Sequence, residues 1–296
     1  MASGREGVIT GAQDTQLFWR SWDSPEARGS LLLVHGLGEH SGRYHAFSCK
    51  LAEWGITVLA FDLRGHGRSQ GPRGDVGAFP HFFQDLLALE QLMDREIPAE
   101  LPRFLLGHSL GGLASLRRLQ VFQGPYAGAI LSAPWLATAL PGWVERAGSF
   151  LGLALPGMSL PSGIGPEKLT RDPEEVREFR KDPLNHTRIT ARLFREVVRV
   201  QKEVLAFRGA MEVPLLFLIP GADPVVRSGV TEDFARGIVG GLAQVEILPG
   251  RLHEPLNDLG RDEVRGRVME WMEARMIAPP EDSSGGRKAS LNLDER

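Results

Sequence analysis

Ser109 stands in a pattern that can perform nucleophilic chemistry, because Gly107 and Gly111 lie two residues before and two residues after it. The apolar stretch 103–106 predicts a short buried strand before this serine, and 113–119 has the spacing of a helix after it. A serine between such glycines can occupy a sharp strand-to-helix turn that exposes its hydroxyl group to a carbonyl carbon. The pattern therefore predicts a nucleophile elbow. The alternative is a serine that only caps the following helix.

A serine nucleophile needs a base and an acid, and two other predicted strand ends supply them. Asp223 follows the apolar run 214–219, and His253 follows the run 244–248. Because the carboxyl ends of parallel strands meet at one edge of a sheet, we expect both side chains to lie near Ser109. His253 would then remove the serine proton, and Asp223 would hold the imidazole ring in place. The chain order serine, aspartate, histidine is that of the α/β-hydrolases.

The loop after the predicted strand at 30–34 is expected to complete the site with an oxyanion hole. Gly36 and Gly38 allow a turn that aims the N–H of Leu37 at the serine. With the N–H of Leu110, the residue after the nucleophile, this makes two donors for a developing oxyanion. The alternative is a plain tight turn. A phosphate cradle is excluded, because the glycine and lysine spacing of such loops is missing.

The other histidines near these loops are expected to stabilise the loops themselves. This interpretation covers His35, His40, His45, His66 and His108. They lack the His-Glu-x-x-His spacing of a zinc site, and the single cysteine excludes a Cys-x-x-Cys pair. We therefore predict that the protein uses no metal and no cofactor.

The elements that position these residues alternate between strands and helices, which is typical of a parallel sheet with helical crossovers. We predict an α/β-hydrolase fold with a mostly parallel central sheet, flanking helices and a helical cap inserted after the strand that follows the nucleophile helix. An antiparallel hairpin at 8–22 forms the edge of this sheet. The remaining predicted strands are 30–34, 57–61, 103–106, 127–132, 214–219 and 244–248, and the predicted core helices are 46–54, 82–93, 113–119 and 262–276.

The alternation stops in the middle of the chain, which predicts an insertion. We expect a hydrolase core at 1–134 and 212–277, a helical cap or lid at 135–211, and a disordered tail at 278–296. Within the insertion, the stretch 140–161 is apolar and rich in glycine and proline. It is interpreted either as a mobile lid that can rest on a lipid surface or as an ordinary buried helix with loops.

Composition limits the classes of partner. The chain has 296 residues and a formal net charge of -3, which does not favour nucleic acid as a partner. One cysteine excludes an intrachain disulfide framework and fits a reducing compartment. The first residues lack the apolar run of a secretory signal, and no run reaches transmembrane length. We expect a cytoplasmic protein whose cap can make transient contact with a membrane surface; the oligomeric state stays open.

Five stretches of the chain form distinct motifs. They are His35-Gly-Leu-Gly-Glu-His40 with Arg43-Tyr44, Asp62-Leu-Arg-Gly-His-Gly-Arg-Ser69, Gly107-His-Ser-Leu-Gly111, Arg171-Asp-Pro-Glu-Glu-Val176 and Lys181-Asp-Pro-Leu184. Together they resemble the motifs of one known family, the monoacylglycerol lipase and lysophospholipase branch of the α/β-hydrolases. The resemblance covers most of 8–276 and is weakest over 140–161. It implies a serine esterase that removes one fatty acyl chain from glycerol or a lysolipid, needs no cofactor and admits substrate beneath its cap.

The predicted function is hydrolysis of a carboxylic ester of a monoacylglycerol or a lysophospholipid-like lipid through an acyl-enzyme on Ser109. One alternative is a broad carboxylesterase, and another is an aminopeptidase or amidase of the S33 type. A more remote alternative is a binding protein that uses the fold without catalysis. Serine at the nucleophile position argues against dehalogenases and epoxide hydrolases, which carry an aspartate there.

Overall fold

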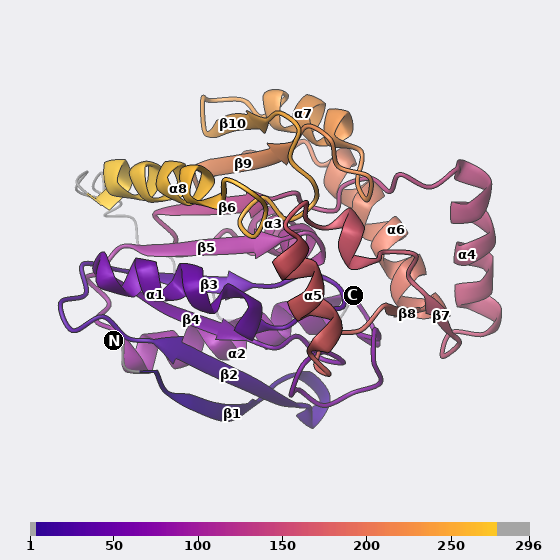
Figure 1. The fold of residues 1–296 in the computed structure, drawn as a ribbon, viewed down its shortest axis with the longest axis horizontal. Helices are drawn as coiled ribbons and strands as arrows, with labels where there is room; N and C mark the ends of the chain where they lie inside the picture. Colours follow the sequence, from indigo (N-terminus) through magenta and orange to yellow (C-terminus); the bar gives the residue numbers. More distant parts are fainter. Residues whose placement is uncertain (1–3, 277–296) are drawn as a thin grey trace.

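The computed structural model describes residues 4–276, and its centre is an eight-stranded sheet. The strand order is β1-β2-β4-β3-β5-β6-β9-β10 (Figure 1). β1 and β2 form an antiparallel edge hairpin, β2 is antiparallel to β4, and the remaining neighbours are parallel. The bounds are β1 Glu6–Thr10, β2 Gln16–Trp22, β3 Gly29–Val34, β4 Ile56–Phe61, β5 Arg103–His108, β6 Gly128–Ser132, β9 Leu215–Pro220 and β10 Ala243–Leu248.

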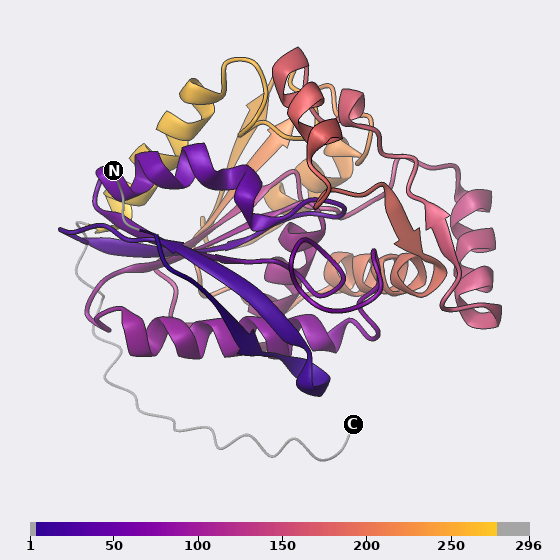
Figure 2. The same ribbon diagram turned by 60° about the horizontal axis from the view of Figure 1, so that its bottom comes forward.

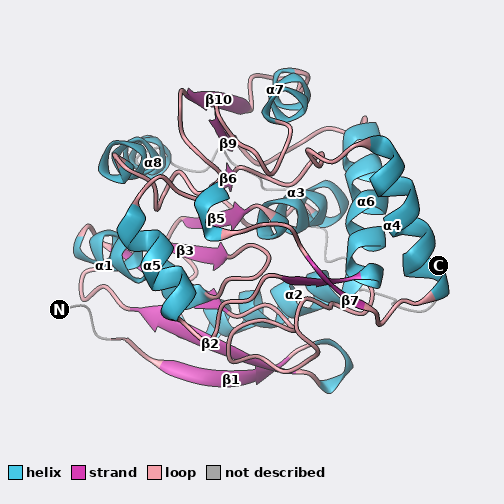
Figure 3. Cartoon of the chain, turned by 45° about the vertical axis from the view of Figure 1, so that its right-hand side comes forward, coloured by secondary structure: helices cyan, strands magenta, loops and turns pink. Residues whose placement is uncertain are grey.

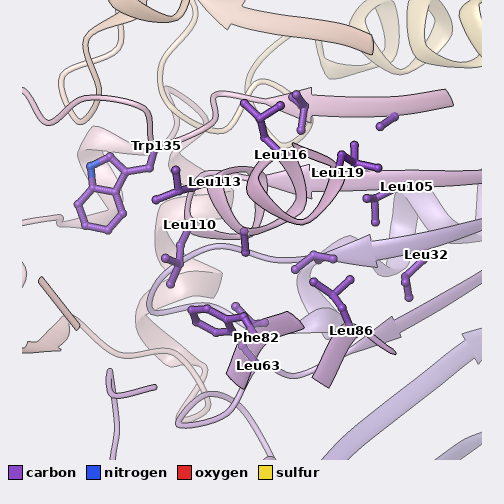
Figure 4. Packing of buried hydrophobic residues seen from close by; sticks show 14 of the residues in the cluster. Leu32, Leu63, Phe82, Leu86, Leu105, Leu110, Leu113, Leu116, Leu119 and Trp135 are labelled. Carbon is purple, nitrogen blue, oxygen red and sulfur yellow. The ribbon is translucent and has the colours of Figure 1, made fainter. Parts of the chain in front are cut away.

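Helices cover both faces of this sheet, and each face has its own apolar core (Figure 2). Successive residues of a strand point to opposite faces, so Leu32 packs with α2, α3 and α6 whereas Leu31 packs with α1 and α8. Figure 4 shows the first core, in which Leu113, Leu116 and Leu119 of α3 meet the strands. The helices are α1 His45–Glu53, α2 Pro80–Glu96, α3 Leu110–Phe122, α4 Gly142–Ala154, α5 Pro173–Lys181, α6 Ala191–Ala206, α7 Ser228–Arg236 and α8 Arg261–Met276.

Residues 135–211, called the cap segment below, lie between β6 and β9, which are direct neighbours in the sheet. The segment contains α4, α5 and α6, and it also has a two-stranded sheet of β7 Ser159–Pro161 and β8 Arg188–Thr190 that the sequence did not predict. Short 3-10 helices occur at Ala12–Asp14, Ser41–Tyr44 and Pro166–Lys168. The domain boundaries stay a prediction, and the predicted tail at 278–296 lies outside the described residues.

The helices α6 and α4 of the cap segment differ in how deeply their apolar side chains are buried. α6 belongs to the core, because Val197, Val200 and Val204 are buried against α3. α4 lies on the outer side of α6 (Figure 3) and keeps a close approach through Gly148, where a Cβ atom would lie 2.5 Å from the Phe194 ring. The interpretation of 140–161 as an ordinary buried helix is wrong, since the large apolar side chains of α4 are mostly exposed to solvent.

Candidate active site

The nucleophile elbow predicted around Ser109 has the backbone conformation that such a turn requires. Ser109 has φ 50° and ψ −113°, a strained region for a residue with a side chain, and it joins β5 directly to α3. A Cβ atom on Gly111 would lie 2.3 Å from the carbonyl oxygen of Val34, and one on Gly107 would lie 2.7 Å from that of Gly111. Both glycines are therefore needed for the helix to pack so close to the sheet.

Three strand ends bring the predicted serine, histidine and aspartate together at one edge of the sheet. The Ser109 hydroxyl lies 2.8 Å from Nε2 of His253, which follows β10. On the other side of the ring, Nδ1 of His253 lies 2.7 Å from Oδ2 of Asp223, which follows β9. This geometry lets Ser109 donate to His253 and lets His253 donate to Asp223, as in a serine hydrolase triad.

The loop around Asp223 keeps this carboxylate charged. Burial alone would raise the pKa of Asp223, but His253 and two backbone N–H groups together outweigh it and lower the pKa. The backbone N–H groups of Val225 and Val226 also donate to Oδ1, at 2.8 and 3.1 Å. The carboxylate can therefore orient the imidazole and stabilise its positively charged form.

The two predicted oxyanion donors flank the serine. Leu110 is the first residue of α3, so its N–H has no helical acceptor four residues before it. On the opposite side, Gly36 lies so near the nucleophile that a Cβ on it would stand 3.1 Å from the Cβ of Ser109. Leu37 lines the small cavity beside Ser109, and Gly38 completes the turn at φ +81°. Donation from Leu37 and Leu110 to an oxyanion stays a prediction.

His108, next to the nucleophile, is a buried neutral residue. Its Nδ1 lies 3.1 Å from the carbonyl oxygen of Ser132, and its ring centroid lies 5.0 Å from that of His253. Burial first, and the nearby His253 second, lower the pKa of His108 to about 3. The side chain therefore fits the loop-stabilising role that the sequence suggests.

A buried charged cluster behind the site was not singled out as functional from the sequence. Nη1 of Arg43 lies 2.5 Å from Oε1 of Glu254 and 3.3 Å from Oε2 of Glu39, so one guanidinium donates hydrogen bonds to two carboxylates. Glu39 also accepts hydrogen bonds from the N–H of Gly36 and the hydroxyl of Tyr44. Burial, and then the charge of Glu254, raise the pKa of Glu39. The only sequence signal was the loop motif at 35–44, whose charged residues are four positions apart.

Comparisons with known proteins agree with this geometry. A family model described as serine aminopeptidase, S33, matches residues 25–260. The chain is 26% identical to a monoacylglycerol lipase of Mycolicibacterium smegmatis over 92% of this chain and 98% of that protein. A solved structure of the monoacylglycerol lipase of Paleococcus ferrophilus is 30% identical, with a TM-score of 0.79, and covers 88% of this chain and 99% of that one. The chain belongs to the monoacylglycerol lipase family of α/β-hydrolases.

This membership confirms the predicted fold class and the family resemblance, and it makes the protein a carboxylic ester hydrolase. One further relative is much longer than this chain. The chain is 28% identical to an uncharacterized abhydrolase domain-containing protein of Dictyostelium discoideum over 93% of this chain, but it spans only 30% of the length of that protein.

In this α/β-hydrolase the cap segment contributes to the wall of the site. The cavity beside Ser109 and His253 has a volume of about 10 Å³, and Ile164 and Leu169 of the cap segment form part of its wall. A space of this size holds about one water molecule. This cavity is therefore smaller than an acyl chain.

Two other properties of residues 4–276 bear on the expectations from sequence. Within that range, no three side chains of histidine, cysteine, aspartate or glutamate are grouped so that they could hold a metal ion. No helix of the described part is both long enough and apolar enough to cross a bilayer.

Proposed function

We propose that this α/β-hydrolase cleaves the ester bond of a monoacylglycerol through an acyl-enzyme on Ser109. The observation that carries the proposal is the hydrogen-bonded chain from the Ser109 hydroxyl through His253 to Asp223, with its two distances of 2.8 and 2.7 Å. A base within hydrogen-bond reach of a nucleophile, itself oriented by a buried carboxylate, is the arrangement that serine hydrolysis needs.

Each group then has one task. His253 takes the proton from Ser109 as the oxygen attacks the ester carbonyl, and Asp223 stabilises the resulting imidazolium. The N–H groups of Leu37 and Leu110 stabilise the tetrahedral oxyanion, and loss of one such donor lowers turnover roughly 100-fold to 1,000-fold. His253 gives its proton to the leaving alcohol. Water then attacks the acyl-enzyme by the same route and releases the fatty acid.

The wall of the cavity favours an ester substrate over a peptide. Leu37, Ile164 and Leu169 present apolar side chains to the space beside the nucleophile, which suits an acyl chain. The free amino terminus of a peptide is positively charged, and a charged group that is taken out of water needs a paired partner such as a carboxylate. Of the described residues lining this cavity, the carboxylates are Glu39 and Glu254, and both are already paired with Arg43. Around this cavity, no unpaired carboxylate of the described residues is therefore left to receive a charged amine, which supports the ester over the peptide.

The relatives favour a glycerol ester as the substrate class. The names of the Mycolicibacterium and Paleococcus proteins describe them as monoacylglycerol lipases, and both align over nearly their full length. A lysophospholipid or a short carboxylic ester would use the same catalytic groups and remains the alternative within ester hydrolysis. The choice depends on the shape of the opened cap segment.

The outer face of the cap segment suits contact with a lipid surface. Large apolar side chains with exposed fractions between 44% and 72% gather along α4 and the turn after it; they are Trp143, Phe150, Leu153, Leu155 and Met158. Exposed apolar groups on an amphipathic helix typically insert into the headgroup region of a bilayer. We propose transient membrane contact at this face of the cap segment.

Hydrolysis measurements with matched serine variants test the catalytic assignment. Ser109→Ala is expected to lower kcat for a monoacylglycerol by roughly 10⁴-fold or more, since it removes the nucleophile. Ser115→Ala is the matched control, because Ser115 is a buried serine of the same helix region whose hydroxyl has no partner among the described residues. Full activity of the Ser109 variant would overturn the assignment.

The substrate panel separates the alternatives. Monoacylglycerols, lysophosphatidylcholine, short nitrophenyl esters and amino-acid amides are compared with the unmodified protein. Turnover of amides alone would support the peptidase alternative, and equal turnover of short esters would support a broad carboxylesterase. Binding without turnover of any of them would support a non-catalytic protein.

Vesicle sedimentation tests the membrane proposal separately. Trp143→Ser with Phe150→Ser is expected to reduce binding to lipid vesicles while hydrolysis of a short soluble ester is retained, because neither side chain lines the cavity. Unchanged vesicle binding would show that α4 is not the contact face.

A further inference from the structure

The peptide groups on both sides of Gly36 are held by side chains. The N–H of Gly36 donates to Oε1 of Glu39 at 2.6 Å. The carbonyl oxygen of Gly36 lies 2.8 Å from Nδ1 of His35, the residue immediately before it. The loop that approaches Ser109 is therefore fixed at two successive peptide groups by hydrogen bonds, and not by its glycine content alone.

The donor in the second contact follows from the surroundings of the His35 ring. The backbone N–H of Leu63 donates to Nε2 of His35 at 2.9 Å, so Nε2 carries a lone pair and no proton. Burial lowers the pKa of His35 to about 3, which keeps the ring neutral. The one ring proton is then on Nδ1, and His35 donates it to the carbonyl oxygen of Gly36.

This carbonyl belongs to the peptide unit that carries the N–H of Leu37. A peptide unit is planar, so fixing the direction of the Gly36 carbonyl also fixes the direction of the Leu37 N–H. We propose that His35 is a positioning residue of the oxyanion hole, which aims the Leu37 N–H at the reacting carbonyl by donating from Nδ1 to Gly36. This inference goes beyond loop stabilisation and rests on the proposed function of Ser109 and Leu37.

Close packing makes the catalytic rate sensitive to this orientation. A Cβ on Gly36 would stand 3.1 Å from that of Ser109, so the loop lies directly against the nucleophile. An oxyanion donor works only at about 2.7 to 3.1 Å from the position that the oxyanion occupies. Rotation of the Gly36–Leu37 peptide unit therefore reduces the stabilisation of the transition state more than it reduces the affinity for substrate. We expect the effect to appear in kcat.

Two substitutions of His35 separate its two hydrogen bonds. The side-chain amide of asparagine can occupy the position of Nδ1 and donate to Gly36, but it does not reach the N–H of Leu63. The side-chain oxygen of glutamine can occupy the position of Nε2 and accept from Leu63, but it does not donate to Gly36. Each variant loses one buried hydrogen bond, so both should lose a similar amount of folding stability. They differ in the group that loses its partner, which is the Gly36 carbonyl in His35→Gln and the Leu63 N–H in His35→Asn.

The expected result is a split between the two variants in kcat. His35→Gln should lower kcat for a soluble ester by roughly tenfold to 100-fold, with KM changed by less than about threefold, because part of one oxyanion donor is lost. His35→Asn should recover most of this loss. His66→Gln is the control, because His66 is equally buried, its ring packs edge-on against His35, and it makes no contact with Gly36.

The other outcomes are also decisive. An equal fall in kcat for both His35 variants, in proportion to their loss of stability in urea, would refute the positioning role and leave a structural one. Unchanged kcat in His35→Gln would refute it as well. Failure of the proposed function is seen separately, as activity that survives in Ser109→Ala or as no ester turnover by the unmodified protein. Failure of this inference leaves ester turnover in place and the Ser109 variant inactive.

Discussion

His108 makes the stability of this protein dependent on pH in a way that one substitution can isolate. Its pKa is about 3 in the folded protein, because burial and the nearby His253 disfavour its charged form, and 6.5 is the ordinary value expected after unfolding. Below pH 6.5 the unfolded chain therefore binds a proton that the folded protein does not. The stabilisation from a neutral His108 is complete above pH 6.5 and is lost progressively as the pH falls toward 3.

The size of this effect follows from the two pKa values. When the unfolded state binds one proton more than the folded state, each unit of decrease in pH lowers the free energy of unfolding by about 1.4 kcal/mol. Between pH 7 and pH 5, His108 alone therefore removes about 2 kcal/mol of stability. In His108→Asn the amide can still donate to the carbonyl oxygen of Ser132, but nothing titrates. The stability of the variant should fall by about 2 kcal/mol less over this interval.

Urea unfolding at pH 7 and pH 5 measures this difference. The other titrating groups are present in both proteins, so their contributions cancel when the two pH dependences are subtracted. An unchanged m-value in each pair of curves shows that the same unfolding transition is compared. Parallel pH dependences for the two proteins would contradict the buried, neutral state assigned to His108.

Three more predictions concern the site and its supports. Asp223→Asn should lower kcat about 10⁴-fold without unfolding the protein, because the imidazole loses the acceptor that selects its tautomer; steady-state kinetics and circular dichroism check this. Gly111→Ala should destabilise the fold by about 3 kcal/mol or more, because its Cβ would lie 2.3 Å from a carbonyl oxygen at the end of β3. Gly142→Ala is the control, since the space around Gly142 is open, and thermal unfolding compares the two variants. Arg43→Met should lower the free energy of unfolding in urea by about 3 to 5 kcal/mol, because two buried carboxylates lose their partner. Adding Glu254→Gln should recover part of that loss, because it removes one of the two unpaired charges.

The sheet and the strand ends could be predicted because their signals are local. Each buried strand of the core is a short apolar run bounded by glycine, proline or polar residues, and the structure has a strand at every predicted position. Once the strands are parallel, their carboxyl ends must share an edge, so Ser109, Asp223 and His253 could be grouped without knowing any distance. Helix starts in the cap segment also have local signals: Asp172 and Thr190 are residue types that favour the N-cap position, and both accept a backbone N–H there.

The supports of the site depend on contacts between distant parts of the chain, which a single sequence does not reveal. Arg43 and Glu254 are 211 residues apart, and nothing in their types distinguishes a buried pair from two solvent-exposed charges. The role proposed for His35 depends on the backbone N–H of Leu63, whose direction is set by the end of β4. The apolar residues of α4 predicted burial as readily as exposure, because their environment depends on how α4 packs on α6.

The single-water cavity at the nucleophile has a consequence for the rate law of this hydrolase. Because the cavity is smaller than an acyl chain, we expect substrate to react with the molecules in which Ile164 and Leu169 have moved away. The apparent KM would then contain the opening equilibrium as well as the affinity of the open form. Smaller side chains at these two positions should increase the opened fraction and remove apolar contacts with the acyl chain, so they should change KM while leaving the chemistry at Ser109 unchanged. Two enzymes with the same triad geometry can therefore differ in apparent affinity through cap residues that never touch the reacting bond.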